Sequence, residues 1–159
     1  ERLEIPYPVQ LLAVGSESDL PDAIKKKYRY VSLPWLDEPD MLAYFRALDI
    51  FLMPSLAETF GLMSIEAMAC ETALICFQST VLESVTNAPD YGIAVEYRSA
   101  RAIADALTEL IKHPEELTDR KRRGKEFVAQ NYRYDTYVTR HLQLFRSVAA
   151  CYHVAKEAK

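Results

Sequence analysis

The feature that most constrains the fold is a series of short apolar runs separated by segments with helical spacing. Most of these runs are continuous, without the polar–apolar alternation of a strand that has one face in water. They occupy residues 9–14, 30–33, 49–53, 72–77 and 92–95. Alternating strands and helices of this kind predict an α/β fold, with a parallel sheet covered by helices on both faces.

The chain length bounds the number of domains, and the fold class bounds where a ligand binds. With 159 residues the sequence suffices for one core, so we expect a single domain over 1–159. Two helices, 114–130 and 134–152, are expected after the last apolar run. In open parallel sheets, ligands bind beyond the carboxyl ends of the strands. The connections to inspect therefore follow Val14, Leu33, Met53 and Phe77.

Composition and charge exclude several classes of function. Half of the residues are hydrophobic and 26% are charged, which is typical of a globular chain and not of a disordered one. The formal net charge is -4, and the basic cluster at 120–123 is accompanied by Glu115, Glu116 and Asp119. Such a cluster indicates a solvated helix face. We therefore expect no nucleic-acid partner.

Cysteine, histidine and hydropathy patterns exclude a metal centre and a membrane span. The three cysteines form no CxxC pair, so we expect free thiols, with Cys70 and Cys76 buried, in a reducing compartment. The three histidines are isolated and lack metal-ligand spacing. No apolar run approaches the roughly 20 residues of a membrane span, and no signal peptide begins the sequence.

The connection from Pro54 to Gly61 follows one apolar run and opens a helix. The start of a helix leaves backbone N–H groups without partners and carries a partial positive charge, which suits a phosphate or a sugar hydroxyl. Gly61 would let a ligand approach the backbone closely. Glu58 by itself is a weak indicator, because a carboxylate ahead of a helix is favourable on account of the helix dipole alone.

Glu66 is the only charged residue between Leu62 and Cys70. At about 100° per residue it shares one helix face with Leu62, Ile65 and Ala69. Burying this carboxylate without partners would cost several kcal/mol, so it needs donors nearby. A ribose diol is one source of such donors. An internal Arg or Lys, or a face of the helix that is exposed to solvent, would equally explain it.

An ordered set of residues resembles the Glu-x7-Glu signature of retaining glycosyltransferases with the GT-B fold, family four above all. The signature residues run from Pro54 through Glu58, Phe60 and Gly61 to Glu66 and Ala69, and neighbouring segments follow in family order over roughly 11–145. The resemblance implies a Rossmann-like three-layer sandwich that forms one half of a twin-domain GT-B enzyme. It implies transfer of a sugar from a nucleoside-diphosphate sugar with retention of configuration, without a cofactor or metal.

The resemblance also implies roles for particular residues. Glu66 would bind the ribose of the donor, and Glu58 would approach the donor sugar as the catalytic residue. The backbone at Thr59, Phe60, Gly61 and Leu62 would contact the sugar and the phosphates. Weaker candidates for the nucleobase site are Leu33, Pro34 and Trp35.

Some positions depart from the family pattern. Glu71 and Ala73 stand where Gly-x-Pro is usual, Gln78 begins a turn that is usually rich in glycine, and Trp35 replaces a glycine. The resemblance implies a basic pair that holds the diphosphate and an N-terminal domain that binds the acceptor, and we expect both to lie upstream of Glu1. We therefore expect an enzyme only as part of a longer cytoplasmic protein, with any peripheral membrane contact made through that other domain.

Three other interpretations compete with this one. The departures at Glu71 and Gln78 are consistent with a catalytically degenerate module that serves interaction or structure. A nucleotide-sugar epimerase shares the twin-domain fold but lacks this Glu-x7-Glu context. A nicotinamide dehydrogenase is disfavoured because no G-x-G-x-x-G follows the first apolar run.

The final helix carries an aromatic stripe that includes Tyr134, Tyr137, His141 and Phe145. A stripe of this spacing is typical of core packing. Loss of the other domain would expose part of it, which would favour self-association of this chain.

Overall fold

The computed structural model describes residues 8–15 and 21–157. In chain order its elements are β1 (Gln10–Val14), α1 (Asp22–Lys27), β2 (Arg29–Leu33), α2 (Glu38–Ala47), β3 (Ile50–Met53), α3 (Leu62–Ala69), β4 (Ala73–Phe77), α4 (Val81–Val85), β5 (Ile93–Val95), α5 (Ala100–Lys112), α6 (Pro114–Asn131) and α7 (Tyr134–Glu157). Every apolar run that predicts a strand contains one. The short helix α4 is not expected from the sequence, and most of the connection after Val14 lies outside the described residues.

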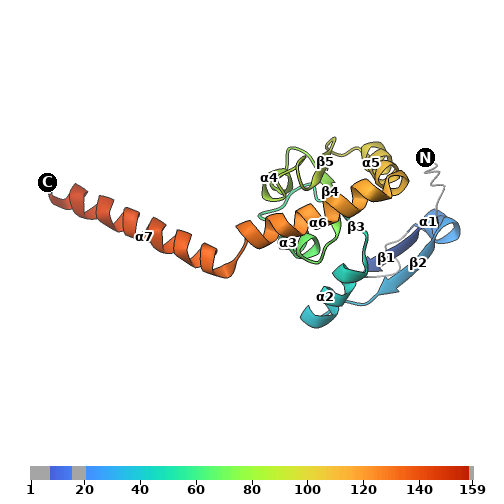
Figure 1. Cartoon of the computed structure of the whole chain (residues 1–159), viewed down its shortest axis with the longest axis horizontal. Coiled ribbons are helices and arrows are strands. Elements are labelled where there is room, and N and C mark those ends of the chain that lie inside the picture. Colours follow the sequence, from blue (N-terminus) through green and yellow to red (C-terminus); the bar gives the residue numbers. More distant parts are fainter. Residues whose placement is uncertain (1–7, 16–20, 158–159) are drawn as a thin grey trace.

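All strand pairs are parallel, which confirms the α/β fold. The strands nevertheless form two hydrogen-bonded sheets, β1–β2 and β3–β4–β5, where one sheet is expected from the sequence. Side chains rather than backbone hydrogen bonds join them, because Leu12, Val14 and Leu33 pack against the core of the larger sheet. The two sheets therefore share one apolar core (Figure 1).

The central strand β4 explains the layers of the larger sheet. All five of its residues are buried, as expected of a strand covered on both faces. Leu74 and Cys76 face a core made with α2, α3, α4 and α6, whereas Ala73 and Ile75 face α5 and its Leu110. Helices thus cover both faces of the sheet, which confirms the layered arrangement.

Burial raises the pKa of the Cys76 thiol to about 11.

A buried hydroxyl joins α2 to the connection between α3 and β4. The Thr72 Oγ1 donates to the carbonyl of Phe45 at 2.7 Å and lies 3.3 Å from the carbonyl of Leu48. Thr72 is 1% exposed, so water does not compete for these carbonyls at the end of α2. The contact fixes how α2 lies against α3.

Two turns keep a backbone conformation that favours glycine although other residues occupy them. Glu71 has φ 65° and Ser79 has φ 59°. A left-handed conformation costs an ordinary residue roughly 1–2 kcal/mol. Local contacts offset part of that cost: the Glu71 carboxylate pairs with Lys125 Nζ at 2.9 Å, and the Ser79 N–H donates to Glu83 Oε2 at 2.8 Å. At these turns Glu71 and Ser79 thus adopt the backbone conformation that glycine favours.

The basic cluster on α6 is partly structural. Arg122 pairs with Asp119 at 2.6 Å and with Glu126 at 2.8 Å on the exposed face, as expected from the sequence. Arg120 and Arg123 instead donate to the carbonyls of Pro89 and Asp90, at 3.0 and 2.9 Å. These bonds fasten the connection between α4 and β5 to α6.

The expectation that the last helix packs its stripe into a core is wrong for this chain. Figure 1 shows α7 projecting away from the body of the molecule. Its large apolar side chains are exposed, among them Tyr134 at 81% and Phe145 at 63%. The spacing of a buried stripe is present, but no element of the described chain lies against most of it.

The described ranges, 8–15 and 21–157, contain neither a membrane-spanning helix nor a cluster of metal ligands. None of the helices there combines the length and the apolar character that crossing a bilayer requires. No group of three or more His, Cys, Asp or Glu side chains in those ranges is arranged to hold a metal ion.

Replacing Thr72 with Val should destabilise the fold. The substitution keeps the side-chain shape but removes the hydroxyl donor, so that the Phe45 carbonyl keeps only the Leu48 N–H at 3.2 Å, at a cost of about 0.5–1.5 kcal/mol. Urea unfolding followed by circular dichroism measures the change. Thr118→Val is the control, because the Thr118 hydroxyl bonds the Pro114 carbonyl on an exposed helix face where water can replace it. Equal losses from the two substitutions would contradict the role assigned to Thr72.

Candidate functional site

The start of α3 is fixed by Gly61. This residue is the N-cap of α3, is buried, and has φ 85° and ψ 52°, in the left-handed region. A Cβ at this position would overlap Leu82 Cδ2 and would lie 3.4 Å from Glu58 Cγ. Both the backbone conformation and the available space therefore demand glycine.

The backbone N–H groups at the start of α3 are open. Among the described residues, no acceptor pairs with the N–H groups of Phe60, Gly61, Leu62 or Met63; the first engaged group is Ser64, which donates to the Gly61 carbonyl at 2.9 Å. The Ser64 hydroxyl donates to the same carbonyl at 2.6 Å. Open N–H groups and the positive end of the helix dipole make this a place for an anion.

Glu58 lies in the connection that precedes α3, and its side chain is exposed. Its Oε1 accepts the N–H of Thr59 at 3.0 Å, so of the predicted backbone donors Thr59 already has a partner. The same connection is held to the sheet by Tyr97, whose hydroxyl donates to the Leu56 carbonyl at 3.1 Å. Glu58 is thus placed beside the open start of α3.

Glu66 lies on the exposed face of α3. The buried residues of the helix are Ser64, Ile65, Ala67 and Met68, whereas Leu62, Met63 and Glu66 face outward. Within the described ranges no ion pair or hydrogen bond holds the Glu66 carboxylate. The interpretation of Glu66 as a buried charge is therefore wrong, and the alternative of an exposed helix face is the one that the structure shows.

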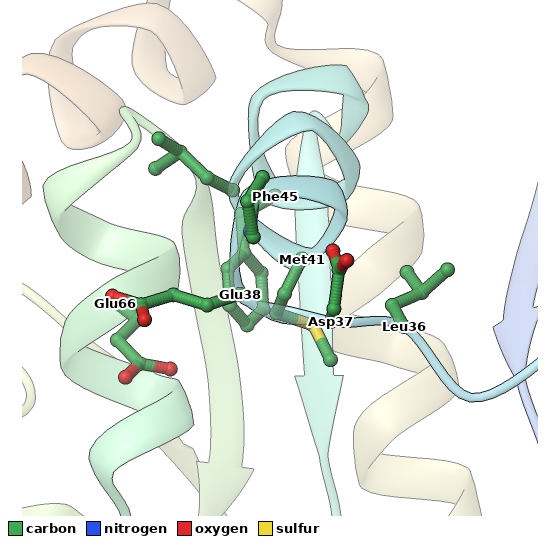
Figure 2. A pocket seen from close by; sticks show the side chains of 8 residues that line it. Leu36, Asp37, Glu38, Met41, Phe45 and Glu66 are labelled. Atoms are coloured by element: carbon green, nitrogen blue, oxygen red, sulfur yellow. The ribbon is translucent and has the colours of Figure 1, made fainter.

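Glu66 nevertheless borders a cavity between α2 and α3, here called the α2–α3 cavity. Its volume is about 600 Å³, and it is lined by Leu36, Asp37, Glu38, Pro39, Met41, Leu42, Phe45 and Glu66. Figure 2 shows the Glu38 side chain extending from the first turn of α2 toward α3, where it lies beside Glu66. Apolar side chains form the floor and three carboxylates lie around it.

The predicted base-site residues lie just before this cavity in the chain. Leu33, Pro34 and Trp35 are not among its lining residues, which begin at Leu36. The Leu33 side chain packs against the core and its carbonyl accepts the Gly15 N–H at 2.9 Å. Trp35 is 86% exposed. The connection after β2 therefore does reach the α2–α3 cavity. It does so through Leu36 and Asp37, which follow the three predicted base-site residues in the chain.

Sequence reasoning misses the α2 side of the cavity. Asp37 caps α2 by accepting the Asp40 N–H at 3.1 Å, and this capping pattern is visible in the sequence. Met41 and Phe45 have the spacing of an apolar helix face, which indicates core packing. That spacing does not predict that the same side chains also form the floor of a cavity.

The two parts of the site differ in charge. No Lys or Arg lines the α2–α3 cavity, so its carboxylates favour a ligand group that donates hydrogen bonds, such as a hydroxyl, over an anionic group. The start of α3 favours an anion. Glu66 lies four residues from Leu62, or about 6 Å along the helix axis. The arrangement suits one ligand whose hydroxyl-bearing part enters the cavity and whose anionic part meets the start of α3.

The chain is similar to a known family and to curated proteins. The profile of the family described as Glycosyl transferases group 1 matches residues 2–113. The D-inositol 3-phosphate glycosyltransferase 1 of Catenulispora acidiphila is 32% identical over 114 residues, which cover 72% of this chain and 27% of that protein. The chain thus spans about a quarter of the length of that curated relative.

Solved structures give the same picture of the fold. Sucrose-phosphate synthase from Thermosynechococcus elongatus superposes with a TM-score of 0.74 at 26% identity, covering 89% of this chain and 39% of that one. The C-terminal domain of the group 1 glycosyltransferase LpcC from Francisella tularensis has a TM-score of 0.60 at 25% identity, covering 71% and 60%. Anabaena HepE in complex with UDP and glucose, at 15% identity, shares the fold with a TM-score of 0.69 over 93% of this chain and 42% of that one.

Replacing Gly61 with Ala should disrupt the start of α3. Backbone strain and the overlap with Leu82 together should cost about 2–4 kcal/mol of folding free energy. Gly15→Ala is the control, because Gly15 also has a positive φ, 123°, but no heavy atom lies within 4 Å of a Cβ placed there. Urea unfolding should show a clearly larger loss for Gly61→Ala. Equal losses would mean that strain alone, and not the packing of Leu82, makes glycine necessary.

Proposed function

Because this chain belongs to the group 1 glycosyltransferases, we propose that it is the domain that binds the nucleoside-diphosphate sugar in a retaining glycosyl transfer. In this proposal residues 1–159 form a single donor-binding domain of a longer enzyme. The observation that supports it most is the position of Glu66, a carboxylate without a protein partner in the described ranges, between an apolar cavity and the open start of α3.

The nucleoside would occupy the α2–α3 cavity. The base would lie over the apolar floor formed by Met41 and Phe45, and the ribose hydroxyls would donate to Glu66. Hydroxyl-to-carboxylate hydrogen bonds are among the stronger ones, since the acceptor is charged. Leu33, Pro34 and Trp35 would then precede the base site and shape its entrance.

The diphosphate and the sugar would lie at the start of α3. The N–H groups of Phe60, Gly61 and Leu62 would stabilise the negative charge that develops on the departing diphosphate, as fixed donors do in other transfers. Glu58 would approach the sugar once its bond to the Thr59 N–H is released or shared. Its proposed catalytic role rests on the family resemblance together with this position.

Transfer needs more than this chain supplies. The start of α3 offers the diphosphate backbone N–H groups, and no cation lines the neighbouring α2–α3 cavity, so the proposal still needs counter-charges for the diphosphate. We assign them, and most of the acceptor binding, to the rest of the enzyme. We therefore expect no turnover from the 159-residue chain by itself.

A catalytically degenerate module is the second candidate. It is motivated by Glu71 and Gln78, which stand where the family usually has glycine. Glu71 and Ser79, the residue after Gln78, nevertheless have positive φ, the conformation that glycine favours. We take this conformation to favour the donor-binding proposal over the degenerate one.

Glu66→Gln in the full-length enzyme should weaken nucleotide binding. Losing the charged acceptor of the ribose hydroxyls should lower the affinity for UDP or GDP roughly tenfold. Isothermal titration calorimetry with each nucleotide measures the change and identifies the preferred base. Glu109→Gln is the control, because Glu109 is exposed on α5 and its pairing with Lys112 at 3.6 Å is a surface contact. Wild-type affinity in Glu66→Gln, or no binding of either nucleotide at millimolar concentration, would refute the proposal.

A further inference from the structure

One face of α2 forms a continuous wall of the α2–α3 cavity. The lining residues on this wall include Glu38, Met41, Leu42 and Phe45. Their spacings of three, four and seven residues from Glu38 place them on the same side of the helix. Met41 follows Glu38 by about 4.5 Å along the helix axis. A flat ring that lies over the apolar side chains therefore has the Glu38 carboxylate at its edge.

The Glu38 carboxylate is available to a ligand. Within the described ranges no hydrogen bond or ion pair holds it, whereas its neighbour Asp37 accepts the Asp40 N–H at 3.1 Å as the cap of α2. Figure 2 shows the Glu38 side chain beside Glu66. No Lys or Arg lines the cavity, so neither carboxylate meets a cation from its walls. Both acceptors are open to hydrogen-bond donors of a bound molecule.

The proposed function assigns only one of these two carboxylates. Glu66 takes the ribose hydroxyls, and the base lies over Met41 and Phe45. Glu38 is on the same helix face as those two side chains and next to Glu66. It therefore faces an edge of the base, and what that edge donates determines how well the base fits.

The nucleobases differ in what they offer to a carboxylate. Guanine carries a ring N–H beside an exocyclic amino group, and these two parallel donors match the two carboxylate oxygens. Uracil has a single N–H between two carbonyl oxygens, which a carboxylate repels. Adenine and cytosine carry an amino group beside a ring nitrogen that is itself an acceptor. A carboxylate at the edge of the base therefore favours guanine.

We propose that Glu38 determines the base specificity of the site and that the donor is a guanosine-diphosphate sugar. The ring N–H and the amino group of guanine donate to Glu38, while the ribose hydroxyls donate to Glu66. The amino group lies on the edge of guanine that borders the ribose, so the two neighbouring carboxylates meet neighbouring donors of one nucleoside. This inference rests on the proposed function, because it names the nucleotide that the same cavity takes.

The test titrates the full-length enzyme with GDP, inosine diphosphate and UDP by isothermal titration calorimetry. Inosine diphosphate is GDP without the amino group, so it isolates the contribution of that donor. GDP should bind roughly tenfold more tightly than inosine diphosphate, and UDP should bind more weakly than GDP. Glu38→Ala should weaken GDP binding roughly tenfold, remove the preference over inosine diphosphate and leave UDP binding no weaker.

Glu115→Ala is the matched control. Glu115 also lies in the first turn of a helix, α6, but it does not line the α2–α3 cavity. Both substitutions remove a carboxylate from the positive end of a helix dipole, so they alter helix stability alike. Glu115→Ala should change none of the three affinities by more than about twofold. Circular dichroism checks that both variants are folded.

The outcomes separate this inference from the proposed function. UDP binding as tightly as GDP, equal affinities for GDP and inosine diphosphate, or equal effects of Glu38→Ala and Glu115→Ala would overturn the inference. If UDP binds more tightly than GDP and Glu66→Gln weakens that binding, the role of Glu38 fails while the proposed donor site stands. If none of the three nucleotides binds at millimolar concentration, the donor site itself is refuted, and the role of Glu38 with it.

Discussion

The left-handed backbone at Gly61 is the constraint on which the candidate site depends. It lets the chain turn from the β3 connection into α3 while packing against Leu82 too closely for any other side chain. That turn leaves the first N–H groups of α3 open. It also sets the helix so that Glu66, four residues after Leu62, borders the cavity next to α2. One residue thus determines both the anion-binding end of the helix and the position of its carboxylate.

The rest of the site depends on how α2 lies against α3. Thr72 fixes this packing through its hydrogen bond to the Phe45 carbonyl, and Phe45 in turn lines the cavity. The resulting surfaces divide the chemistry by charge. Carboxylates surround the α2–α3 cavity, and open N–H groups lie at the start of α3. In the proposed function a nucleoside and its diphosphate would meet these surfaces in that order.

Most of the fold could be predicted from the sequence because local pattern determines it. Apolar runs mark the five strands, and α5 begins after Ser99, whose side chain caps it as serine commonly does. Packing between distant segments could not be predicted. The composition of α3 is apolar on nearly all sides, so it does not show that Glu66 faces solvent. The stripe of α7 resembles a buried one, yet no described element covers it. The residues of α2 that line the cavity have the spacing of ordinary core positions. The sequence from Leu36 to Phe45 therefore does not indicate that a cavity lies there.

The most direct test of the central claim is a crystal structure of the full-length enzyme with UDP or GDP, whichever binds more tightly. The account predicts ribose hydroxyls within about 2.6–3.2 Å of the Glu66 carboxylate. It places the base over Met41 and Phe45 and the diphosphate at the N–H groups of Gly61 and Leu62. A nucleotide bound outside the α2–α3 cavity, or one whose ribose makes no contact with Glu66, would contradict it.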